Sequence, residues 1–78
     1  MSETLTQLNE VFQDVFDDDE IVVARETSAK DIEDWDSLMH VNLVLAVESK
    51  FGVRFTSTEV ASLKDVGELN DLVEKKLA

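Results

Sequence analysis

The sequence predicts an all-α fold, a small bundle of three main helices plus one short helix, in a single domain over residues 1–78. Apolar residues recur at helical spacing in three separate segments. The only stretch with strand character, residues 21–24, has no second stretch with which to pair. With 78 residues, 44% of them hydrophobic, and no proline, the chain is near the lower size limit for one stable core.

The first helix is expected to start at Ser2 or Thr4, either of which could cap it, and to end near the acidic cluster 17–20. Its apolar positions are Leu5, Leu8, Val11, Phe12, Val15 and Phe16. About twenty residues then precede the second helix, and so long a connection is usually functional or held down by its own side chains. The residues expected to hold it to the core are Ile21, Val22, Val23 and Ile32.

The second helix is predicted from Ser37 to Phe51, with Asp36 as its N-cap and Gly52 just past its end. Helical spacing divides its apolar residues between two faces. The wide face holds Leu43, Val44, Val47 and Phe51, and a second stripe holds Leu38, Val41 and Leu45. We expect the wide face to enter the core and the stripe to stay exposed as a docking surface, because a small bundle seldom buries a helix on every side. Burial of the helix all round is the alternative.

Residues 53–55 are predicted to form a short extended connection to a brief third helix that ends at about Leu63. Its cap candidates lie in residues 56–59. Asp65 is expected to cap the last helix, with Glu68 three residues later as an approximate capping box. The core positions of this helix are Val66, Leu69, Leu72, Val73 and Leu77, and Lys75 and Lys76 suit its C-terminal dipole.

The charge of the chain restricts its partners. Eighteen acidic against seven basic residues give a net charge of −11, which disfavours nucleic acid and anionic membranes and favours proteins with basic patches. Cysteine is absent, so disulfides and thiolate metal sites are excluded. No signal peptide is recognisable, and the longest apolar run, residues 41–47, is too short to cross a bilayer. We therefore expect a cytoplasmic monomer.

The acidic cluster 17–20 is a weak candidate for calcium. An EF-hand loop needs glycine at its sixth position and glutamate at its twelfth, and counting from Asp17 these positions hold Val22 and Ser28. A solvated acidic turn or a contact with a partner is the better interpretation, and no metal site is predicted.

Ser37 is the main candidate for chemistry. Its predicted place in the first turn of a helix, after the cap Asp36, suits a phosphate esterified to its hydroxyl. A nucleophilic serine would need a base oriented by a third group, and the single histidine, His40, lies three residues away on the same helix. We therefore predict a modified serine, with His40 as a partly buried packing residue and Trp35 fastening the long loop to the bundle.

The sequence of Asp36-Ser37-Leu38, opening a helix that closes with Glu48-Ser49-Lys50-Phe51-Gly52-Val53, resembles the acyl carrier proteins. The match covers almost the whole chain, and the predicted helices follow in the order and at the distances typical of that family. The resemblance implies an acyl-carrier-like bundle that is not an enzyme.

The resemblance also implies that Ser37 receives 4′-phosphopantetheine from coenzyme A. A separate magnesium-dependent phosphopantetheinyl transferase, the holo-carrier synthase, would attach this arm. Acyl groups would then travel on the arm as thioesters, loaded by a ligase or acyltransferase and used by pathway enzymes with basic or apolar docking patches. The expected docking residues are Leu38, Met39, Val41, Asn42, Leu45 and Glu48, and the bundle interior would shelter part of the acyl chain.

Some positions depart from the pattern of carriers in fatty acid synthesis. Met39 and Asn42 stand where acidic residues are common, and Ser49 and Lys50 follow Glu48 in place of further carboxylates. Trp35 replaces a small residue before the motif. This form is similar to discrete carriers of specialised pathways, so we expect a dedicated carrier of an acyl, or alternatively an aminoacyl or peptidyl, group. A helical interaction module that is never modified is the competing function, and a small hydrolase that uses Ser37 is disfavoured.

Overall fold

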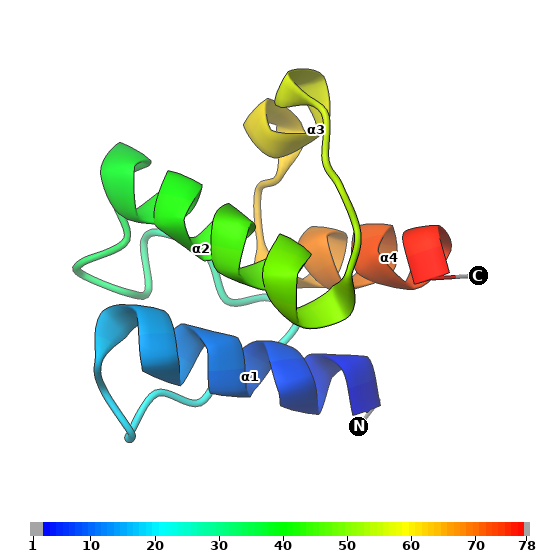
Figure 1. The fold of residues 1–78 in the computed structure, drawn as a ribbon. Helices are drawn as coiled ribbons and strands as arrows, with labels where there is room; N and C mark the ends of the chain where they lie inside the picture. Colours follow the sequence, from blue (N-terminus) through cyan, green and yellow to red (C-terminus); the bar gives the residue numbers. More distant parts are fainter. Residues whose placement is uncertain (1–2, 78) are drawn as a thin grey trace.

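The computed structural model describes residues 3–77. The chain forms α1 (Glu3–Phe16), α2 (Ser37–Phe51), α3 (Ser57–Ser62) and α4 (Val66–Leu77), and no strand occurs within the described residues. Helix α1 packs against α2 and α4, while α2 lies between α1 and the short α3 in Figure 1. The predicted all-α bundle of three long helices and one short helix is confirmed.

One core joins the three long helices and the loop between α1 and α2. Its fully buried large side chains are Leu8, Phe12, Leu43, Val47, Val66, Leu69 and Val73. Most predicted core positions are confirmed. Leu77 is an exception, 52% exposed at the last residue of α4, where too little of the bundle lies opposite to cover it. Leu72 is only half-buried.

The predicted bounds of α2 are confirmed at both ends. Asp36 has extended backbone, and its Oδ1 accepts a hydrogen bond from the Met39 N–H at 2.9 Å. Gly52 adopts the left-handed conformation with a φ of 68°, and its N–H donates to the carbonyl of Glu48 at 2.8 Å. Only glycine adopts that conformation without steric cost, so the glycine fixes the end of the helix.

The other caps agree in part with prediction. Thr56 and Glu59 form a reciprocal capping box at α3. Asp65 accepts the Glu68 N–H at 2.9 Å, but the Glu68 carboxylate accepts from the Lys64 N–H, one residue before the expected position. Thr4 is not a cap, because it lies inside α1. The other candidate, Ser2, lies outside the described residues.

The acidic cluster 17–20 ends α1. Asp17 has a φ of 51°, and the Asp18 N–H donates to the carbonyl of Gln13 at 3.0 Å, which satisfies a terminal carbonyl of the helix. No group of three or more carboxylate and histidine side chains among residues 3–77 is arranged to hold a metal ion. The backbone of Asp17 and Asp18 thus ends α1.

The long loop of residues 17–36 is held to the bundle by side chains and hydrogen bonds. Val23 is 3% exposed, and its N–H donates to Oδ1 of Asn9 at 2.7 Å. Ile21 and Ile32 pack against the core, as predicted. Val22 does not pack against the core and is 80% exposed. Neighbouring side chains in extended backbone point in opposite directions, so Val22 faces solvent where Val23 faces the core.

The N-terminus of α4 holds the middle of this loop. The N–H of Val66 donates to the carbonyl of Thr27 at 2.8 Å, and the N–H of Gly67 donates to that of Arg25 at 2.7 Å. A Cβ at position 67 would lie 2.9 Å from the Arg25 carbonyl oxygen, so this approach requires glycine. Arg25 also forms a two-point ion pair with Asp71 at 2.9 and 2.8 Å, and its hydrogen bonds lower the pKa of the Asp71 carboxyl.

Candidate functional site

Ser37 is the first residue of α2 and lies exposed on the surface. The Asp36 cap takes the N–H of Met39, which leaves the N–H groups of Ser37 and Leu38 without an acceptor inside the helix. The loop that precedes Ser37 is fixed by Trp35, whose ring meets the ring of Phe12 edge to face at 5.2 Å. The half-buried Trp35, packed on the buried Phe12, therefore positions an accessible hydroxyl.

His40 is not placed to activate that hydroxyl, because both of its ring nitrogens have other partners. Nδ1 accepts a hydrogen bond from Nε1–H of Trp35 at 3.1 Å, and Nε2 lies 3.2 Å from the carbonyl oxygen of Val60. An indole N–H can only donate, so Nδ1 must be the acceptor, and the proton on Nε2 then donates to Val60. His40 is half-buried and stacks on Trp35 with centroids 6.0 Å apart. Its hydrogen bonds go beyond the packing role predicted from the sequence.

The second apolar stripe of α2 is exposed, as the spacing predicted. Leu38, Val41 and Leu45 are 71%, 51% and 57% exposed. In contrast, Leu43 and Val47 on the opposite face are fully buried. The helix thus presents an apolar surface to solvent while a different apolar face enters the core.

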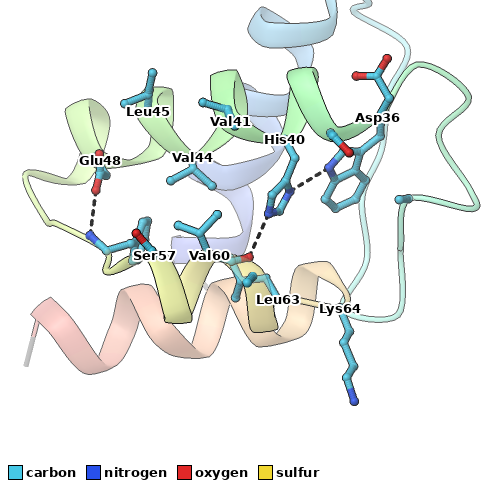
Figure 2. A pocket seen from close by; sticks show the side chains of 15 residues that line it. Asp36, His40, Val41, Val44, Leu45, Glu48, Ser57, Val60, Leu63 and Lys64 are labelled. Carbon is cyan, nitrogen blue, oxygen red and sulfur yellow. Dashed lines mark hydrogen bonds between the residues drawn. The ribbon is translucent and has the colours of Figure 1, made fainter.

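A cleft of about 700 Å³ separates α2 from α3 (Figure 2). It runs from Ser37 and His40 at one end to Glu48 and Phe55 at the other. Apolar side chains from both helices line the middle, among them Val44 and Val60. The stripe residues Val41 and Leu45 also line this cleft, so the exposed stripe and the cleft share a border. Helical spacing within one helix could not predict this, because α3 supplies the opposite wall.

Glu48 closes the far end of the cleft. Its Oε2 accepts the backbone N–H of Phe55 at 2.7 Å, which holds residues 53–55 against the C-terminal part of α2 (Figure 2). Glu48 is half-buried. Of the residues expected to dock partners, Met39 is also half-buried and Asn42 is exposed.

Charge is distributed unevenly around this site. No charged residue occurs from Ser37 to Val47 if His40 is neutral, whereas Glu33, Asp34 and Asp36 are exposed on the preceding loop. The exposed face of α2 is therefore uncharged over residues 37–47 and dominated by the apolar stripe, and an acidic margin lies at the Ser37 end. No helix within the described residues is long and apolar enough to cross a membrane.

Comparisons with known proteins point to one family. The chain is 42% identical to the acyl carrier protein of Acidothermus cellulolyticus over 71 residues, which cover 91% of this chain and 84% of the relative. It is 35% identical to the acyl carrier protein of Thermosynechococcus vestitus over 78 residues, covering 99% and 95%. The solution structure of the holo acyl carrier protein from Geobacter metallireducens superposes with a TM-score of 0.91 at 51% identity, covering 97% of this chain and 87% of that chain. No protein-family model matches the chain.

Proposed function

The chain belongs to the acyl carrier protein family, and on this basis we propose that it carries acyl groups on a 4′-phosphopantetheine arm attached to Ser37. As an acyl carrier it delivers substrates to enzymes and is not itself an enzyme. The observation that carries the proposal is the exposed hydroxyl of Ser37 at the start of α2, beside the mouth of an apolar cleft. The arm supplies the thiol that the cysteine-free chain lacks.

Attachment needs a separate transferase. The Ser37 oxygen forms a phosphodiester with the phosphopantetheine group of coenzyme A, the anhydride bond breaks, and adenosine 3′,5′-bisphosphate and the hydroxyl proton leave. The first turn of α2 favours the resulting anion by only about 0.3–1 kcal/mol at an exposed position. The neighbouring Asp36 carboxylate opposes it. These residues can orient a covalently attached phosphate, but they are too weak to hold a free one.

The exposed stripe of α2 supports a role in docking. We assign partner contacts to Leu38, Val41 and Leu45, flanked by Met39 and Asn42, with Glu48 at the far margin. Because this face is apolar, its partners need an apolar groove, and basic residues would match the acidic loop beside Ser37. An apolar docking face of this kind favours recognition by a dedicated set of enzymes: a transferase, a loading ligase or acyltransferase, and the enzymes that use the acyl group.

The cleft between α2 and α3 is the proposed site for the acyl chain. Its middle is lined by apolar side chains, and the His40 ring and the Glu48 carboxylate near its two ends already have hydrogen-bond partners. Burial of an apolar acyl chain there would be favourable by about 25 cal/mol for each Å² of apolar surface removed from water.

Intact mass spectrometry tests the attachment. The chain is incubated with coenzyme A, Mg²⁺ and a phosphopantetheinyl transferase of broad specificity, and we expect a gain of one phosphopantetheine group. Ser37→Ala should abolish the gain, while Ser57→Ala, which alters an exposed serine lining the same cleft, should retain it. No gain, or a gain that survives Ser37→Ala, would favour the helical module that is never modified.

The product of that reaction then tests the dedicated pathway. It is offered to fatty-acid-synthesis enzymes and, separately, to adenylate-forming ligases with fatty acids or amino acids. Loading by a ligase without chain extension by the synthesis enzymes is the expected result, and loading with amino acids alone would indicate an aminoacyl carrier. Efficient extension of acyl chains on this carrier would exclude a dedicated role.

A further inference from the structure

A hydrogen-bonded bridge crosses the cleft next to Ser37. It runs from Nε1–H of Trp35 to Nδ1 of His40, and from Nε2–H of His40 to the carbonyl of Val60 in α3, at 3.1 and 3.2 Å (Figure 2). We call these two hydrogen bonds the His40 bridge. It connects the loop, α2 and α3, and Trp35 is itself anchored on Phe12 in the core.

Helix α3 has few other attachments. It spans six residues and none of them is buried, so its own hydrogen bonds cannot keep it helical or in place. Glu59 pairs with Lys76 of α4 at 3.0 Å, and the Val60 carbonyl also accepts from the N–H of Leu63 at a long 3.4 Å. The carbonyl that His40 binds is thus one of the last in α3, where a helix lacks internal donors.

We propose that His40 is a positioning residue that controls how readily α3 separates from α2, and thereby which acyl groups enter the cleft. This inference rests on the proposed function, since it concerns cargo carried from Ser37. An acyl chain that passes from Ser37 toward Val44 must pass between the two helices that the His40 ring connects. Straight apolar chains that reach the middle of the cleft displace the Val60 bond, whereas an acetyl group is too short to do so.

The bridge also provides its own signal. The Trp35 indole N–H and the Val60 carbonyl bind opposite nitrogens of one imidazole ring. Hydrogen bonds in such a chain polarise one another, so loss of the Val60 bond when α3 moves also weakens the Trp35 hydrogen bond. The indole resonance of Trp35 therefore reports whether the bridge is intact. This is the only tryptophan in the chain, which makes the resonance unambiguous.

Amide hydrogen exchange of the unmodified chain tests the bridge directly. His40→Phe keeps a flat ring but removes both hydrogen bonds, and we expect the Val60 and Leu63 amides to exchange about fivefold faster, the effect of one neutral hydrogen bond. His40→Gln retains a donor and an acceptor and should exchange at nearly the wild-type rate. Ser57→Ala is the control, because it changes the far end of the cleft and leaves the bridge intact. Exchange at Leu43 and Val47 should be unchanged.

Carriers loaded from octanoyl and acetyl coenzyme A test the link to cargo. In the wild type, octanoyl should shift the Trp35 indole resonance and acetyl should not. In His40→Phe the Trp35 indole resonance should already lie where the wild type moves on octanoylation, and neither acyl group should shift it further. Hydroxylamine should cleave the octanoyl thioester of this variant several-fold more slowly than that of the wild type, because a cleft that opens more easily takes up and protects the chain more often.

Three results would overturn the proposal. Unchanged α3 exchange in His40→Phe would mean that the bridge does not hold α3, and an equal increase in α2 and α3 would make His40 a general packing residue. The third is contact of the octanoyl chain with Val44 while the Trp35 resonance stays fixed. Failure of the transferase to modify Ser37 would instead contradict the proposed function, and the exchange measurement would still decide the bridge.

Discussion

The two walls of the cleft are built by different forces. Helix α2 has fifteen residues and buries Leu43, Val44 and Val47, while α3 has six residues and buries none. Full burial of one such apolar side chain contributes about 1.5–3 kcal/mol. The hydrogen bonds that hold α3 contribute about 0.5–1.5 kcal/mol each. One wall is therefore fixed to the core, and the other can move away without unfolding the molecule.

This difference suits a carrier. Ser37 and the exposed stripe that we propose for docking lie on the fixed wall, so an enzyme would meet the same surface whatever the cargo. The movable wall faces the space that cargo would occupy, and cargo of different sizes could be accommodated there at small cost. We therefore expect substitutions in the core face of α2 to lower the stability of the whole molecule, and substitutions in α3 to loosen only α3.

The largest effect is expected from Leu43→Ala. Leu43 is fully buried, and the cavity left in its place should lower the free energy of unfolding by about 2–5 kcal/mol, measured by urea denaturation. Leu45→Ala is the matched control, the same substitution in the same helix at a residue that is 57% exposed, and should cost about 0.5 kcal/mol. Similar losses for both variants would mean that the two faces of α2 are not distinct.

A smaller and local effect is expected from Thr56→Ala. It removes the side chain that accepts the Glu59 N–H at 3.1 Å, and an N-cap of this kind contributes about 1 kcal/mol. Faster amide exchange should be confined to α3, with the urea midpoint nearly unchanged. Thr58→Ala, two residues later on an exposed position, is the control. A matching fall in the urea midpoint would show that α3 and the core unfold together.

Local features of both walls could be predicted from the sequence. The bounds of α2 and the α3 capping box are local, since a cap and the amide it binds lie within a few residues. Asp36, Gly52, Thr56 and Glu59 were therefore recognisable without the fold. The apolar spacing of α2 likewise separated its buried and exposed faces.

Features made by distant segments were not predictable in this way. The His40 bridge joins positions 35, 40 and 60, and Gly67 matters because the Arg25 carbonyl approaches it from another part of the chain. A glycine inside an otherwise regular helix was a signal that could have been noticed. Val22 was assigned to the core by residue type and Leu77 by helical spacing, whereas burial depends on what lies opposite.

The smallest effect is a preferential loosening of α3 in acid. The hydrogen bond from the Thr56 N–H, followed by the one from Lys76, lowers the pKa of the Glu59 carboxyl below its ordinary value. A carboxyl whose pKa is lower in the folded state stabilises the fold above its unfolded pKa, about 4.3 for glutamate, and this contribution is lost as the pH falls through the lowered value. Protonation then weakens both the capping box that starts α3 and the ion pair that attaches α3 to Lys76 of α4.

Elsewhere, acidification neutralises carboxylates and so relieves the repulsion of a net charge of −11, except at Asp71, whose ion pair with Arg25 is also lost in acid. Acid should therefore loosen α3 before it affects the core face of α2. Methyl resonances of Val60 should change at a higher pH than those of Val47 in an NMR titration. Lys76→Met removes one cause of the lowered pKa, so the Val60 transition should move to higher pH while the Val47 transition stays in place. If the two valines changed together, or if Lys76→Met left the Val60 transition where it was, Glu59 would not contribute to holding α3 on the bundle.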